Sequence, residues 1–144
     1  MAVKPIPDGF QQVIPYLVIA DPDKTVAFLK AAFKAKLIED VKGPDGATHH
    51  AEVRIGDSVV MMGRASDKHK PMASMLYVYV KDVDATYKAA VKAGATSLME
   101  PADQFYGDRN AGVADSQGVQ WWIATRKENL SKKELQKRAN AART

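Results

Sequence analysis

The side chains most able to do chemistry form two small groups. His50 and Glu52 share one side of a strand-like run, and Tyr106, Asp108 and Arg109 lie within four consecutive positions. An imidazole and a carboxylate bind metals or move protons, and the second group offers acid–base and oxyanion chemistry. Two ligands on one strand face do not complete a metal site, so His50 and Glu52 are predicted to form a cross-strand polar pair.

The second group is predicted to lie in a long loop, residues 101–110. Tyr106, Asp108 and Arg109 are therefore candidates for catalysis without a metal, because loops carry function more often than packing. The alternative is that Asp108 and Arg109 pair to shape the loop. The sequence has no nucleophile triad, phosphate loop or dinucleotide fingerprint. Cysteine is absent, which excludes disulfides, thiolate catalysis and cysteine-ligated zinc.

An internal repeat indicates which elements position these groups. Asp21-Pro22-Asp23 follows one strand-like run and Asp82-Val83-Asp84 follows another, at an offset of 82 − 21 = 61. The turns Gly56-Asp57 and Gln117-Gly118 repeat at the same offset. Each copy reads as strand, helix and three strands, and paired copies of such a unit form one fold.

The predicted fold is α+β. Two βαβββ modules, at about residues 10–63 and 73–126, form an open, barrel-like mixed sheet around a groove. A short helix follows at about residues 131–142, and the whole chain, 1–144, is predicted to be a single domain. The first strand is predicted over residues 12–19. Gly94 ends the second helix. Its counterpart in the first module is Lys36, with Lys34 nearby, so the first helix closes without a glycine, and a left-handed residue there costs about 1 kcal/mol or more.

Several segments of the chain together resemble one known superfamily. The segments are Pro15-Tyr16-Leu17-Val18-Ile19, Ala27–Phe33, His50–Ser58, Asp82-Val83-Asp84, Ala93-Gly94-Ala95, Phe105–Arg109 and Trp121–Thr125. They are similar to the vicinal oxygen chelate superfamily, which contains glyoxalase I, bleomycin resistance proteins and extradiol dioxygenases. Within it the chain most resembles the PhnB-like branch. The resemblance implies the fold more firmly than the function, because one scaffold hosts unrelated chemistries.

The resemblance also implies where a metal would bind. Metal-dependent members place one ligand, usually His or Glu, on the first and last strand of each module. The equivalent positions here are Ile14, Met61, Met75 and Trp122. None of these side chains suits a hard divalent cation. We therefore predict no metal and no cofactor, which disfavours the glyoxalase and dioxygenase mechanisms.

An apolar, aromatic groove is expected in place of the metal. Strand alternation predicts that it is lined by Tyr16, Met61, Met75, Tyr77, Gln120 and Trp122. Hydroxyl, indole and amide groups are costly to bury without partners, so this mixture fits a pocket that stacks a planar ligand. The alternative is that these residues only fill the core.

Charge and composition narrow the partners. The net charge is +4 and the pI is about 9.2, but the lysines are scattered rather than gathered on one face. This predicts no nucleic-acid partner and favours a neutral or anionic small molecule. No apolar run is long enough for a membrane span and no signal peptide is recognised, so a cytoplasmic location without membrane association is expected. The resemblance implies a two-fold homodimer.

Three functions are compatible with the sequence. The first is a metal-free protein, similar to bleomycin resistance proteins, that binds a small, partly aromatic molecule in the groove. The second is a metal-independent enzyme of lyase, isomerase or transferase type that uses Tyr106, Asp108 and Arg109. The third is a structural or regulatory dimer with a vestigial groove.

Overall fold

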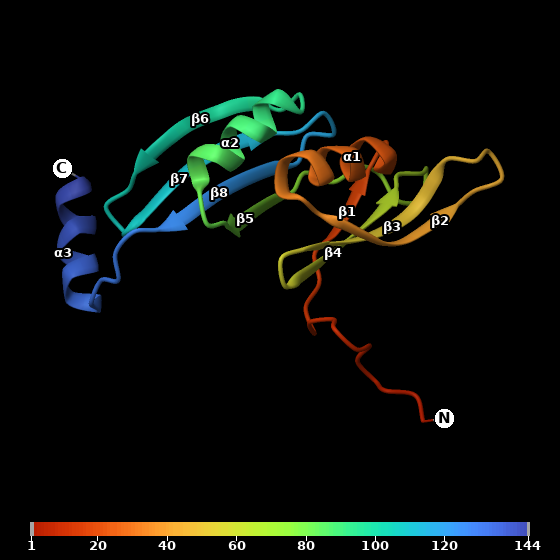
Figure 1. The fold of residues 1–144 in the computed structure, drawn as a ribbon, viewed down its shortest axis with the longest axis horizontal. Helices are drawn as coiled ribbons and strands as arrows, with labels where there is room; N and C mark the ends of the chain where they lie inside the picture. Colours follow the sequence, from red (N-terminus) through yellow and green to blue (C-terminus); the bar gives the residue numbers. More distant parts are fainter. Residues whose placement is uncertain (1, 144) are drawn as a thin grey trace. The chain divides into compact units, whose positions relative to one another are not determined.

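The same succession of one strand, one helix and three strands occurs twice in the computed structural model, which describes residues 2–143. One compact unit ends at Ser74 and the other begins at Met75. Figure 1 shows each unit as a small sheet with one helix lying across it. The first unit comprises β1 (Tyr16–Ile19), α1 (Pro22–Phe33), β2 (Lys36–Lys42), β3 (Thr48–Ile55) and β4 (Ser58–Arg64). The second comprises β5 (Met75–Tyr79), α2 (Val83–Lys92), β6 (Thr96–Asp103), β7 (Asp108–Ala114), β8 (Gln120–Arg126) and the C-terminal α3 (Lys132–Ala142).

Both sheets have the same topology. The strand orders are β1-β4-β3-β2 and β5-β8-β7-β6, with the first pair in each sheet parallel and the others antiparallel. Tyr16 pairs with Met61 and Tyr77 with Trp122, so both partners repeat at 77 − 16 = 61 and 122 − 61 = 61. The α+β prediction, the two open mixed sheets and the internal repeat are thereby confirmed.

Each helix covers one face of its own sheet and leaves the other face bare. Packing α1 on β3 and β4 buries Leu29, Val53 and Met62 completely. In the second unit, α2 packs on β6, β7 and β8, and Trp121 and Ile123 are fully buried. Because successive side chains of a strand point to opposite faces, the neighbours of these core residues must face away from the helices.

Side chains and backbone conformation fix the helix ends. Asp21, Asp82 and Ser131 are the N-caps, and each accepts hydrogen bonds from amides of the first turn. Gly94 adopts a positive φ of 106° just after α2. At the end of α1 the same left-handed region is occupied by Lys34, at φ 56° and ψ 34°. This confirms that α1 closes without glycine, in a backbone conformation that an L-residue adopts at a cost.

Replacing Lys34 by glycine is expected to raise the free energy of unfolding by about 0.5–1 kcal/mol, because glycine adopts positive φ without a steric penalty. Urea unfolding followed by circular dichroism measures the change. Lys36→Gly is the matched control. Lys36 is an exposed residue in β2, so glycine there should lower stability through chain entropy. Equal losses from both substitutions would contradict the argument.

Two predicted boundaries were wrong. The first strand starts at Tyr16 rather than residue 12, after Pro15, and β1 lies at one end of its sheet. The long loop at 101–110 does not exist either, because β6 runs to Asp103 and β7 begins at Asp108. Pro101 lies in an end strand beside an irregular register, where its missing N–H is tolerated.

The C-terminal helix is held by charged side chains. Its residue Arg138 binds Glu128 at 2.8 Å and Glu134 at 3.1 Å, and also donates to the carbonyl of Phe105, which lies in the β6–β7 turn. No residue of α3 is buried. Within the described part of the chain, no helix has both the length and the apolarity that a membrane span requires.

Candidate functional site

The bare face of the second sheet carries an exposed aromatic patch. Met75, Tyr77 and Tyr79 of β5 point away from α2 and remain 66%, 44% and 55% exposed. The indole of Trp122 lies on the same face because Tyr77 and Trp122 are paired. A row of large apolar side chains left uncovered beside polar groups is typical of a surface that binds something.

This face contains an open pocket of about 250 Å³. It is lined by Met75, Tyr77, Met99, Gln104, Tyr106, Asn110 and Trp122. Three of the predicted groove residues, Met75, Tyr77 and Trp122, therefore lie together, and Tyr106 of the other candidate set joins them. None of the lining side chains is charged, so the pocket offers aromatic surface and neutral hydrogen-bonding groups.

A glycine determines where the Trp122 ring lies. A Cβ added at Gly112 would approach the indole carbons of Trp122 to 2.6 Å, so the ring lies directly over the backbone of β7. The indole N–H donates to the Gln120 side-chain oxygen at 3.1 Å. Gln120 thus holds the ring in place, although it does not line the pocket itself.

The polar edge of the pocket has hydrogen-bonding capacity to spare. Asn110 is 3% exposed, and its amide nitrogen donates to the hydroxyl oxygens of Tyr77 at 3.2 Å and Tyr106 at 2.5 Å. The Asn110 side-chain oxygen is buried without a partner. The Tyr106 hydroxyl accepts a hydrogen here and still has its own hydrogen to donate. The Asn110 oxygen is closed to a bound molecule, so the Tyr106 hydroxyl is the group of this pair that can bond to a ligand.

Asp108 lies beneath the aromatic patch and is fully engaged. It is 3% exposed; one oxygen accepts from Tyr77 at 2.7 Å and Tyr79 at 2.8 Å, and the other from Arg126 at 2.6 Å. Burial alone would raise the pKa of this carboxyl group, but the three donors together lower the pKa below its ordinary value. Burial also raises the pKa of Tyr77, with Asp108 adding to the effect. Asp108 therefore holds the two tyrosines and is not available as a general base.

Arg109 faces the other way. Its guanidinium group binds Asp84 of α2 at 2.9 Å and 3.0 Å and Asp103 at 3.2 Å. Asp108 and Arg109 are neighbours in a strand, so their side chains lie on opposite faces of the sheet. The predicted Asp108–Arg109 pair is thus wrong, and the set of Tyr106, Asp108 and Arg109 does not converge on one site.

The bare face of the first sheet carries a different row of polar groups. Tyr16 is 49% exposed, and its hydroxyl lies 3.0 Å from Nδ1 of His50. The other ring nitrogen of His50 lies 2.9 Å from a carboxylate oxygen of Glu52. Met61, the remaining predicted groove residue, is paired with Tyr16. His50 and Glu52 thus bond to each other along β3, and the Tyr16 side chain of β1 reaches His50 across β4.

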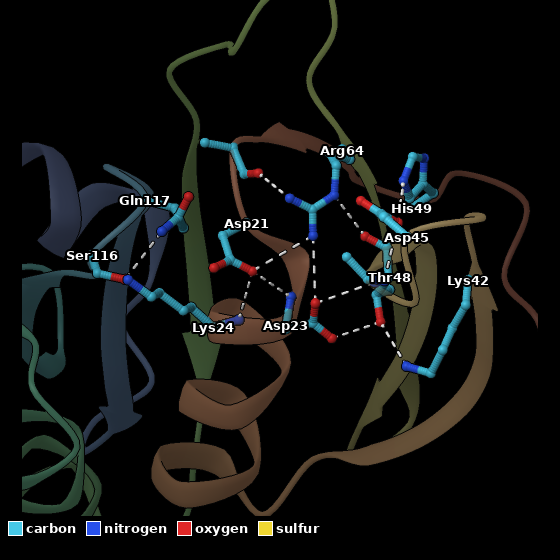
Figure 2. Close-up of polar contacts among 12 residues, drawn as sticks. Asp21, Asp23, Lys24, Lys42, Asp45, Thr48, His49, Arg64, Ser116 and Gln117 are labelled. Atoms are coloured by element: carbon cyan, nitrogen blue, oxygen red, sulfur yellow. Dashed lines mark hydrogen bonds and ion pairs between the residues drawn. The ribbon is translucent and has the colours of Figure 1, made fainter.

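A second polar cluster, at the start of α1, is structural (Figure 2). Arg64 of β4 binds Asp23 at 3.4 Å and lies 3.8 Å from Asp21, and it also donates to the Ala20 and Thr48 carbonyls. The buried Thr48 bonds to Asp23 and Asp40, and these bonds lower the pKa of both carboxyl groups. The cluster fastens the start of the helix to β3 and β4.

The residues present do not fit the metal site that the resemblance implies. Ile14, Met61, Met75 and Trp122 offer only hydrocarbon, thioether and indole groups, whereas hard divalent cations need oxygen or imidazole ligands. Over residues 2–143, no group of three or more His, Asp or Glu side chains is placed to hold a metal ion.

Comparison with known protein families agrees with the fold and the repeat. Residues 9–123 match the family model described as the Glyoxalase/Bleomycin resistance protein/Dioxygenase superfamily. The chain belongs to this superfamily. Superfamily membership accounts for the two βαβββ units, and it leaves the ligand undetermined because its members differ in chemistry.

The chain is similar in sequence or in fold to several other proteins. An uncharacterised protein of Mycobacterium bovis is 32% identical over 133 residues, covering 85% of this chain and 88% of its own. The crystal structure of TioX from Micromonospora sp. ML1 is 25% identical with a TM-score of 0.69, covering 81% of this chain and 98% of TioX. TnmS3, an antibiotic-binding protein from Streptomyces sp. CB03234, is 18% identical with a TM-score of 0.64, covering 88% and 99%. At 18% identity the last likeness is one of fold.

Three residues of the pocket escaped the sequence reasoning: Met99, Gln104 and Asn110. Met99 lies on β6, within the strand predicted over residues 96–100, whereas Gln104 of the β6–β7 turn and Asn110 of β7 fall in the predicted loop 101–110. A strand assignment over 108–114 would have placed Asp108, Asn110 and Gly112 on one face by the period of two. That alternation of polar residues and glycine was the available signal.

Proposed function

We propose that this protein binds a small, planar, partly aromatic molecule, neutral or anionic, without a metal ion. The observation that carries the proposal is the open pocket of the second unit, where the Tyr106 hydroxyl, with its hydrogen still free to donate, lines the same pocket as the Trp122 ring. Aromatic faces supply most of the contact area in such sites and a few fixed polar groups supply orientation.

Pocket size and charge define the ligand class. A volume of about 250 Å³ lies just below the usual range for drug-sized ligands, so one or two fused rings fit. The uncharged lining favours a neutral ring system, and the net charge of +4 disfavours a cation. The Tyr106 hydroxyl accepts from Asn110 and donates its own hydrogen to an acceptor on the ligand.

Binding is favoured over the two other functions by specific contacts. An enzyme built on Tyr106, Asp108 and Arg109 lacks support, because Asp108 is saturated and Arg109 is bonded to Asp84. A vestigial groove is disfavoured because the pocket is open rather than filled by side chains. The antibiotic-binding TnmS3 is a fold neighbour whose function is of the proposed kind. A PhnB-like affiliation, a cytoplasmic location and a two-fold homodimer, which would cover the unpaired end strands, remain part of the proposal.

Calorimetric titration with three matched naphthalene probes tests the proposal. We expect 2-naphthol and 2-naphthoate to bind and 2-naphthylmethylammonium to bind more weakly, because only the last is a cation. A chelator present throughout should leave binding unchanged, since no metal takes part. Gly112→Ala should weaken binding by roughly tenfold or more, because the added methyl group displaces the Trp122 ring.

Ser116→Ala, an exposed change in the β7–β8 turn, serves as the matched control and should bind as the wild type does. Binding that disappears with the chelator would overturn the metal-free part of the proposal. No heat from any naphthalene probe, or equal affinity in Gly112→Ala, would overturn the binding site itself.

A further inference from the structure

The Tyr16–His50–Glu52 row in the first unit is a chain of hydrogen bonds with a defined direction. Glu52, when ionised, can only accept, so the ring nitrogen facing it, Nε2, carries the hydrogen. The other nitrogen of the neutral ring, Nδ1, is then an acceptor, and the Tyr16 hydroxyl donates to it. The hydroxyl hydrogen of Tyr16 is thereby committed, and its oxygen is left as an acceptor.

The sheet is shaped to make this contact. Tyr16 lies on β1 and His50 on β3, so β4 runs between them. The residue of β4 at that point is Gly63, which is paired with both Val18 and His50. A Cβ at Gly63 would lie 2.5 Å from the Tyr16 hydroxyl oxygen, so only glycine lets the tyrosine cross the strand to reach the imidazole. The rings of Tyr16 and His50 are stacked, with centroids 5.7 Å apart.

Burial increases along the chain of hydrogen bonds, from Tyr16 to Glu52. Tyr16 is half exposed, whereas the side chains of His50 and Glu52 are 28% and 16% exposed. The carboxylate is thus the most shielded member and the tyrosine the one that a bound molecule meets. A base held by a buried carboxylate, with a hydroxyl group as the outer member, is the arrangement that activates a hydroxyl for proton transfer.

We infer that Tyr16, His50 and Glu52 form a proton-accepting relay, which binds the acidic hydroxyl of a phenol or enol and takes up its proton. The ligand O–H bond breaks, and its electron pair stays on the ligand oxygen. The proton forms a new O–H bond on Tyr16 while the former Tyr16 proton moves to Nδ1 of His50. The resulting imidazolium is stabilised by Glu52, and the ligand remains as an oxyanion.

This inference does not depend on the pocket of the second unit. Tyr16 is the group that contacts the ligand, and His50 and Glu52 are positioning residues that act through it. The relay predicts a ligand preference that a purely structural role for Tyr16 does not. Tyr16 should favour ligands that donate a hydrogen over isosteres that cannot.

Absorbance of bound 4-nitrophenol tests the relay, because the anion and the neutral phenol absorb at different wavelengths. In the wild type we expect the pKa of the bound phenol to fall by about one unit, a tenfold rise in the ratio of anion to phenol. Tyr16→Phe, which keeps the ring, and His50→Gln should abolish the shift. Glu52→Gln should reduce it, because a neutral amide does not stabilise an imidazolium.

Gly63→Ala tests whether the three side chains must be in contact. It retains Tyr16, His50 and Glu52 but moves the tyrosine off the imidazole, so the shift should be lost. His49→Gln, the neighbouring position with its side chain paired to Asp45, is the control and should keep the full shift. 4-Nitroanisole, which has no acidic hydrogen, should bind more weakly than 4-nitrophenol to the wild type and equally to all variants.

Nitrogen-15 spectra of the histidine rings provide a second measurement. Nε2–H should be the protonated tautomer of His50 in the wild type, and Glu52→Gln should lose that preference. Thermal unfolding followed by circular dichroism verifies that each variant is folded. An unshifted spectrum for 4-nitrophenol with the wild type, a shift that survives in Tyr16→Phe or Gly63→Ala, or the Nδ1–H tautomer of His50 would overturn the relay.

Discussion

Trp121→Ala is expected to lower the free energy of unfolding by about 3–5 kcal/mol, whereas the adjacent Trp122→Ala should lower it by only about 1–2 kcal/mol. The difference follows from which face of the sheet each ring occupies. Trp121 is fully buried on the α2 face, and its indole N–H donates to the buried Asp115 at 2.9 Å. Trp122 lies over Gly112 on the bare face, where water or another side chain can replace part of its contact.

Ligand binding should be weakened more by Trp122→Ala than by Trp121→Ala. In titrations with 2-naphthol, Trp122→Ala should lose about 1–3 kcal/mol of binding free energy, as expected for an aromatic anchor. Urea unfolding gives the stability of each variant, and calorimetry gives its affinity. Trp122→Phe is the conservative control and should retain most of both. A loss of stability from Trp122→Ala as large as that from Trp121→Ala, with no probe bound by the wild type, would mean that Trp122 is a core residue.

Asp108→Ala is expected to lower the free energy of unfolding by about 2–4 kcal/mol at neutral pH. The substitution removes the acceptor shared by Tyr77 and Tyr79 and the partner of Arg126. The pocket should be affected as well, because Tyr77 lines it. Chemical denaturation measures the effect. Asp103→Ala is the matched control: Asp103 is also paired with an arginine but is 77% exposed, and its removal should change stability little.

The same carboxyl group makes part of the stability depend on pH. The pKa of Asp108 is lower in the folded protein than its ordinary value near 4, so its stabilising contribution is complete above that value. The contribution is lost as the pH falls through the lowered pKa of the folded state. The stability difference between the wild type and Asp108→Asn should therefore shrink as the pH falls below about 4. A difference that stays constant through this range would show that Asp108 is not ionised in the folded protein.

The sequence was most informative where a pattern depends on neighbours along the chain. Asp21 and Asp82 marked the starts of the two helices, because caps are formed by residues a few positions apart. The sequence also predicted that the first helix ends without a glycine, near Lys36, and the structure places the left-handed residue at Lys34. The offset of 61 predicted the equal registers of Tyr16 with Met61 and of Tyr77 with Trp122. A repeated spacing in sequence becomes a repeated spacing in space when both copies fold in the same way.

The sequence was less informative where the same residue type occurs in two kinds of local structure. A loop is predicted over residues 101–110, although Pro101 lies in the end strand β6 and Gly107 in a tight turn. That error placed Asp108 and Asn110 outside the strand that holds Gly112 and hid the face that the three residues share. The sheet tolerated the proline because an end strand has one edge without hydrogen-bonded partners.

By itself, the sequence determined the α+β class and the doubled strand–helix–strand order. These depend on residue type, period and spacing, which are properties of the chain. Only the tertiary structure decided that Asp108 binds Arg126 rather than Arg109, and that Tyr16 reaches His50 across Gly63. These contacts join residues 18 and 34 positions apart. Such partners are selected by strand order and by the face on which each side chain lies, and a one-residue change of register would exchange them all.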